Sequence, residues 1–75
     1  MDSINIFLKI HKKNTALVTT AIDSFEGVAA VRTPNPDPNS KFAILHCMVS
    51  PDYIDLFKKI IKDLSKEIEI EEANL

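Results

Sequence analysis

The chain has 75 residues, of which 45% are hydrophobic and 27% are charged, and its formal net charge is −2. This length supports one domain over residues 1–75, and the composition excludes a disordered segment. The charge balance gives no overall positive field to collect nucleic acid or an anionic membrane, and no apolar run reaches the roughly 18 residues that span a bilayer. The lone cysteine, Cys47, excludes an internal disulfide. We therefore expect a cytoplasmic protein without a membrane segment.

Alternating apolar residues predict a half-buried strand from Ile4 to Ile10. The side chains expected to face a core are Ile4, Ile6, Leu8 and Ile10. A helix follows, with Asn14 or Thr15 as its N-cap. Its apolar stripe at helical spacing comprises Leu17, Val18, Ala21, Ile22 and Phe25. Gly27, the only glycine, is expected to end this helix in a left-handed conformation that a Cβ would strain.

The middle of the chain predicts a β-hairpin. Residues 28–33 are β-branched or small, and residues 41–49 are strongly apolar, so both stretches are typical of strands. Residues 33–40 hold three of the four prolines and connect the two strands. We expect this segment to be a rigid hairpin connection; the alternative is a recognition arm whose prolines lower the entropy cost of binding.

The last third of the chain predicts a helix and a short strand. Ser50, Pro51 and Asp52 are typical of an N-cap, a first-turn proline and a first-turn acid. The buried stripe should be Tyr53 or Ile54, then Phe57, Ile60, Ile61 and Leu64. On the exposed side, Lys59 lies at ion-pair spacing from Asp55 and Asp63. Residues 67–72 alternate Glu and Ile, which favours a final strand with Ile68 and Ile70 inward over a frayed helix end.

This order of elements predicts an α+β, ferredoxin-like βαββαβ two-layer sandwich with two helices on one face of an antiparallel sheet. Both faces of the strand over residues 41–49 are apolar. The side chains expected to face the helices are Ala43, Leu45, Cys47 and Val49. Those expected to face outward are Phe42, Ile44, His46 and Met48, beside Phe7, Lys9 and Arg32. An apolar outer face predicts cover by a second copy of the chain or by a partner protein.

The phrase Phe25-Glu26-Gly27-Val28-Ala29-Ala30-Val31-Arg32-Thr33, with the strand, short Pro-containing turn and amphipathic helix after it, resembles a family of small uncharacterised bacterial domains of ACT-like, ferredoxin-like architecture. The resemblance spans most of the chain. It implies an ACT-like, ferredoxin-like fold, and an ACT-like domain that binds an amino acid or another small anion is the first alternative to a non-catalytic interaction or regulatory module. Amino-acid-binding ACT domains usually carry an Asp-x-Pro-Gly-like turn after the first strand, where this chain has His11-Lys12-Lys13-Asn14.

Two groups of residues are candidate sites. The turn formed by His11, Lys12, Lys13 and Asn14 precedes a helix N-terminus, where backbone N–H groups and the helix dipole favour a small anion such as a phosphate or carboxylate. A solvated polar turn is the simpler interpretation. The outward set Phe7, Lys9, Arg32, Phe42, Ile44, His46 and Met48 favours a homodimer or partner-protein interface. Its mixture of aromatic and basic residues makes single-stranded RNA binding the second alternative.

The sequence predicts no catalytic residue, no metal site and no cofactor. It contains no Gly-rich phosphate loop, no Ser/His/Asp or Cys/His arrangement and no CxxC pair. We expect His46 to be a partly buried or interface histidine and Cys47 to be a packed core thiol. The sequence therefore predicts a non-catalytic interaction or regulatory module that self-associates through its sheet.

Overall fold

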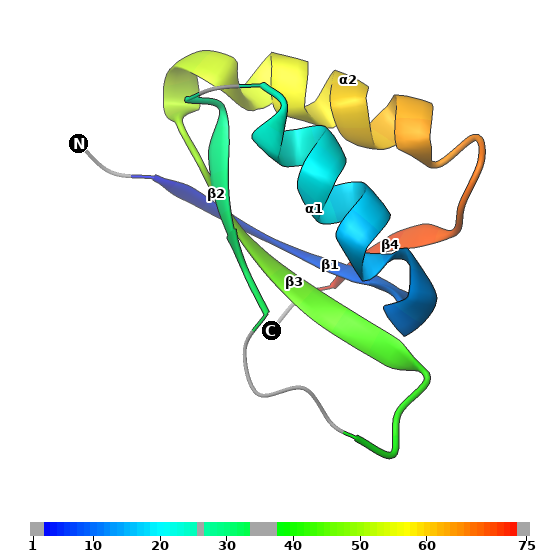
Figure 1. Cartoon of the computed structure of the whole chain (residues 1–75). Helices are drawn as coiled ribbons and strands as arrows, with labels where there is room; N and C mark the ends of the chain where they lie inside the picture. The colour runs from blue at the N-terminus through cyan, green and yellow to red at the C-terminus, as the bar shows by residue number, and fades with distance from the viewer. Residues whose placement is uncertain (1–2, 26, 34–37, 74–75) are drawn as a thin grey trace.

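The protein is described by a computed structural model that places residues 3–25, 27–33 and 38–73. Its elements in chain order are β1 (Ile4–His11), the 3-10 turn η1 (Lys12–Asn14), α1 (Thr15–Asp23), β2 (Ala29–Arg32), β3 (Phe42–Val49), the 3-10 turn η2 (Pro51–Tyr53), α2 (Ile54–Leu64) and β4 (Ile70–Ala73). The strands form one sheet in the order β2-β3-β1-β4, and all neighbouring pairs are antiparallel. Both helices cover the same face of the sheet (Figure 1). This α+β arrangement is compatible with a ferredoxin-like layout.

The register of β3 confirms the predicted division of its two faces. Ala43, Leu45, Cys47 and Val49 are all at most 5% exposed and belong to the core beneath the helices. From β1 the core receives Leu8 and Ile10, whereas Ile4 is 38% exposed, so its predicted core position is wrong. The reason is that β4 pairs only with residues 7–10 of β1, which leaves Ile4 without a neighbour on that side.

The buried stripe of α1 is narrower than the sequence predicts. Val18 and Ile22 are fully buried, but Leu17 and Phe25 are 48% and 42% exposed. Phe25 follows the end of α1 at Asp23, so the helical spacing no longer directs its side chain toward the core. Gly27 has a φ of +80°, which confirms the predicted left-handed position after the helix.

Both helices begin with a 3-10 turn. Pro51 occupies the first turn of η2 after an extended Ser50, as predicted, but the serine side chain caps no backbone N–H. The backbone carbonyl of Ser50 instead accepts a hydrogen bond from the Tyr53 N–H at 2.9 Å. Tyr53 is 45% exposed, so Ile54 is the residue that begins the packed stripe before the buried Phe57 and Ile60.

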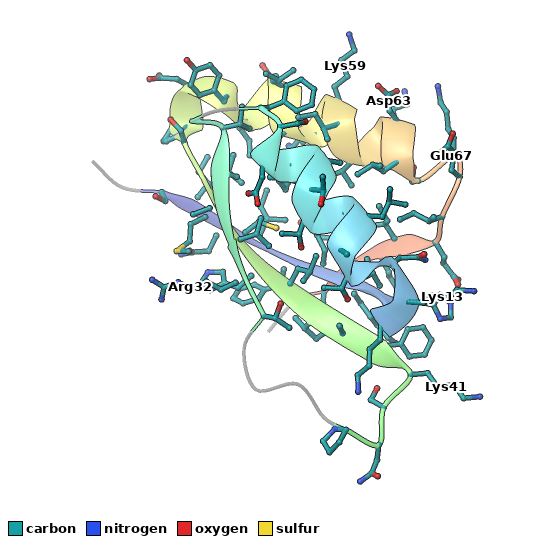
Figure 2. All side chains as sticks on the ribbon, in the orientation of Figure 1. Lys13, Arg32, Lys41, Lys59, Asp63 and Glu67 are labelled. Carbon is teal, nitrogen blue, oxygen red and sulfur yellow. The ribbon has the colours of Figure 1, made fainter. Side chains whose placement is uncertain are left out.

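The end of α2 differs from the sequence prediction in two respects. The Leu64 carbonyl accepts hydrogen bonds from the N–H groups of Glu67 and Ile68, both at 3.0 Å, so the final strand begins at Ile70 and not at Glu67. In the part of the chain that the structure describes, Asp63 forms its ion pair with Lys66, at 3.8 Å, and not with Lys59. Figure 2 shows Lys59 and Asp63 on the side of α2 that faces away from the sheet. Residues 34–37 of the predicted proline loop lie outside the described residues.

Candidate protein interface

The side of the sheet opposite the helices, here called the outer face, carries the candidate site. Because side chains alternate along a strand, the pairing register assigns to it Asn5, Phe7, Lys9 and His11 of β1, Ala30 and Arg32 of β2, Phe42, Ile44, His46 and Met48 of β3, and Glu71 and Ala73 of β4. All seven residues that the sequence singles out as an interface therefore share one face. Among the described residues, four other large hydrophobic side chains are exposed outside this face: those of Ile4, Leu17, Phe25 and Tyr53.

Two ring pairs organise the outer face. Phe7 and His46 are direct neighbours across β1 and β3, and their rings stack with centroids 4.5 Å apart and planes 13° apart. The Nε2–H of His46 donates to Oδ1 of Asn5 at 2.9 Å, and this hydrogen bond holds the imidazole ring in place. This half-buried position agrees with the expectation for His46.

The second ring pair lies at the other end of the central strands. The rings of His11 and Phe42 have centroids 4.7 Å apart, and His11 Nε2 lies 3.2 Å from Oε2 of Glu69. The ammonium group of Lys9 lies over the Phe42 ring, 4.5 Å from its centroid, which is cation–π geometry. On the central strands, the outer-face side chains of Lys9, His11 and His46 thus each contact a phenylalanine ring. The fourth polar side chain there is that of Asn5.

The structure divides the candidate anion-binding turn. His11 is the last residue of β1, and its side chain belongs to the outer face, whereas Lys12, Lys13 and Asn14 form η1. The backbone N–H of Lys12 donates to the Lys41 carbonyl at 3.0 Å, so this donor is already used within the chain. Phe7 and Lys9 alternate along β1 on the outer face. Continuing this alternation by two residues predicts that His11 also lies on the outer face.

Cys47 lies in the core and has no exposed surface. Desolvation by burial raises the pKa of its thiol from 9.0 to about 11. The thiol is therefore protonated at neutral pH, which is the opposite of what a cysteine nucleophile requires.

This raised pKa predicts a loss of stability at alkaline pH. The folded state favours the neutral thiol, so the stabilisation is complete below pH 9 and disappears as pH rises through about 11. Between pH 8 and pH 11 the free energy of unfolding should fall on the order of 2–3 kcal/mol further in the wild type than in Cys47→Ala, where nothing ionises at this position. Urea unfolding of both proteins at each pH measures the difference; equal pH slopes would contradict the buried thiol.

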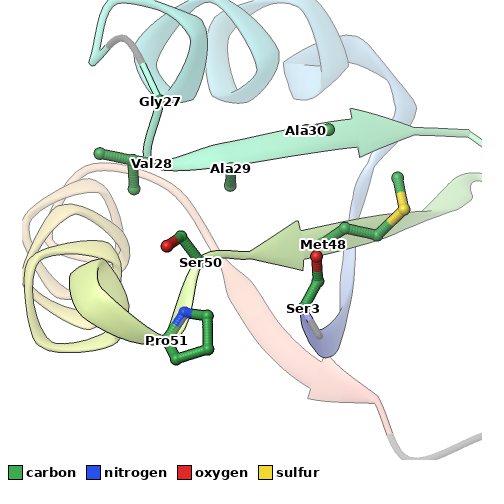
Figure 3. Close-up of a pocket in the computed structure, with 8 residues that line it drawn as sticks. All are labelled: Ser3, Gly27, Val28, Ala29, Ala30, Met48, Ser50 and Pro51. Carbon is green, nitrogen blue, oxygen red and sulfur yellow. The ribbon is translucent and has the colours of Figure 1, made fainter. Parts of the chain in front are cut away.

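The surface has two hollows, one that reaches the outer face at Ala30 and Met48 and one outside this face. The first, of about 380 Å³, is lined by Ser3, Gly27, Val28, Ala29, Ala30, Met48, Ser50 and Pro51 (Figure 3). The second, of about 500 Å³, lies between α2 and β4, where Lys58, Lys62 and Glu72 border an apolar floor. Within the described residues, no three His, Cys, Asp or Glu side chains are placed to hold a metal ion.

The described helices are too short or too polar for any of them to cross a membrane. Comparison of this chain with protein-family models, with curated proteins and with solved structures found no match in any of the three.

Proposed function

We propose that this chain is a non-catalytic interaction module of ferredoxin-like, ACT-like build, which forms a homodimer by stacking its outer face on that of a second copy. The observation that carries the proposal is that half of the outer-face residues are apolar, including Phe7, Ile44 and Met48 on its two central strands. A sheet that faces water usually carries polar residues there. The single buried thiol suits a reducing compartment, and we propose the cytoplasm as the location.

The size of the outer face supports a second copy as the occupant. Two central strands of eight residues and two edge strands of four residues give a face of roughly 400 Å² in plan, from the usual strand spacing and rise. Two such faces, with the additional surface of their side chains, approach the lower end of the range of about 1,200–2,000 Å² buried in specific complexes. A dimer therefore needs the whole outer face and not a part of it.

The ring pairs also support packing against another sheet. Phe7 and Phe42 each have one ring face occupied by a histidine of the same chain, and Lys9 lies over Phe42 as well. Side chains fixed in this way lose little rotamer entropy on association. The same contacts leave less ring surface for the stacking of nucleic-acid bases, which single-stranded RNA binding needs.

The solution molar mass, measured by size-exclusion chromatography with light scattering, tests the proposal. Two copies of 8.4 kDa should give a particle of about 17 kDa at micromolar concentration. A monomer over the whole accessible concentration range would overturn the homodimer. The same monomer would then be tested with a labelled single-stranded RNA, whose binding should weaken steeply with salt if the RNA alternative holds.

A further inference from the structure

Two opposite charges at the two edges of the outer face have no ion-pair partner among the residues that the structure describes. Arg32 lies on β2 at one edge, and Glu71 lies on β4 at the other. Neither side chain forms an ion pair with any other residue that the structure describes. Glu71 lies opposite Lys9 on β1, but the Lys9 ammonium group is directed to the Phe42 ring.

The same edges differ in side-chain size. One row crosses all four strands of the outer face, in the order Arg32, His46, Phe7 and Ala73. Arg32 thus places a long cationic side chain at the β2 end of the row, and Ala73 places only a methyl group at the β4 end. The stacked rings of His46 and Phe7 lie between them. Ala73 leaves a low position beside the Phe7 ring, and Glu71 lies two residues away along β4, about 7 Å at the usual strand rise.

Aligned stacking of two identical sheets allows two orientations of the dimer axis. If the axis is perpendicular to the strands, each edge strand lies over the same strand of the partner. Such an axis through this row would place Arg32 of one copy against Arg32 of the other. An axis parallel to the strands reverses the row. Each β2 edge then lies over the β4 edge of the partner. The long Arg32 side chain lies over the short Ala73 side chain, and its cation lies near the Glu71 carboxylate.

We propose that the homodimer axis runs parallel to the strands, so that the Arg32 side chain of each copy lies over the partner's Ala73, between the partner's Phe7 ring and the partner's Glu71. This inference rests on the proposed homodimer and specifies its geometry. The guanidinium group stacks on an aromatic ring and pairs with a carboxylate, two contacts that suit its planar form. The His46–Phe7 ring pairs of the two copies meet at the axis, each histidine over a phenylalanine.

Crosslinking between single-cysteine substitutions tests this geometry. Arg32→Cys and Ala73→Cys each add one accessible thiol, while Cys47 is buried and protonated and does not compete. The two variants are prepared separately, mixed in equal amounts, allowed to exchange subunits, and treated with a bis-maleimide linker that spans about 10 Å, the spacing of stacked sheets. We expect crosslinked dimer in the mixture and several-fold less in either variant alone.

The outcomes separate this inference from the proposed function. Efficient crosslinking of Arg32→Cys to itself would show that the β2 edges face each other and would overturn the axis assignment while retaining the dimer. No crosslinked species from a mixture that light scattering shows to be dimeric would overturn it also. A monomeric wild type would overturn both proposals.

Charge exchange provides a second readout. Arg32→Glu and Glu71→Arg should each raise the dimer dissociation constant roughly tenfold, as expected for loss of a partly buried charge pair, and the double variant should restore most of the affinity. Lys59→Glu, which makes the same charge change as Arg32→Glu on the far side of α2, is the matched control. Additive losses in the double variant would contradict the pairing of Arg32 with Glu71.

Discussion

Phe7→Asp should convert the homodimer into a monomer. Phe7 lies on β1 near the centre of the outer face, stacked on His46, and in the proposed dimer two copies of its ring are buried at the axis. The substitution removes both rings and places two carboxylates in their position, where each would lose its hydration. Because central aromatic residues dominate interface energies, we expect the dissociation constant to rise at least a hundredfold, roughly 3 kcal/mol. Light scattering over a range of protein concentrations measures the change.

Two further variants distinguish loss of the interface from loss of the fold. Ile44→Asp alters a neighbouring outer-face residue on β3 and should also give a monomer. Leu17→Asp makes a comparable exchange at a side chain that is 48% exposed on the helical layer, and its mass should remain that of the wild type. Circular dichroism must show that all three proteins are folded. Wild-type mass in both outer-face variants would mean that the chain does not associate through this face.

The sheet could be predicted from the sequence because inward-facing and outward-facing side chains alternate along β1 and β3 without interruption. A shift of one residue in β3 would place His46 in the core and Cys47 outside, so the burial of Cys47 is a strict test of the register, and the prediction is confirmed. The outward positions of Phe7 and Lys9 follow from their pairing with His46 and Ile44. Strand periodicity therefore predicted which side chains share the outer face.

Contacts that depend on chain ends and turns could not be predicted in the same way. The two lysines after His11 predict a polar turn there, but the pairing of His11 with Phe42 extends β1 by one residue. The predicted strand does not include Glu67 and Ile68, because their N–H groups donate helix-end hydrogen bonds to the Leu64 carbonyl, which are incompatible with extended backbone. Ring stacking, and the absence of an ion pair at Arg32 and Glu71 within the described residues, depend on side-chain geometry across strands, which a one-dimensional pattern does not contain.

Phe57→Ala should come close to unfolding the domain. Phe57 is 1% exposed and is the largest fully buried side chain among the described residues. It belongs to α2 and packs in the same core as Leu8 and Leu45. Deleting a buried phenyl ring costs about 3–5 kcal/mol, while a domain of this size has a stability of roughly 4–11 kcal/mol.

Tyr53→Ala is the matched control, because it removes an aromatic ring that is 45% exposed just before the same helix and should cost less than about 1 kcal/mol. Urea unfolding followed by circular dichroism, at one fixed protein concentration, compares the free energies of unfolding, since mass action contributes to the stability of a dimer. A loss below about 1 kcal/mol in Phe57→Ala would mean that α2 does not close the core. A loss of the expected size in a variant that retains its dimer mass when folded would show that the helical layer and the outer face make separable contributions, one to the fold and the other to association.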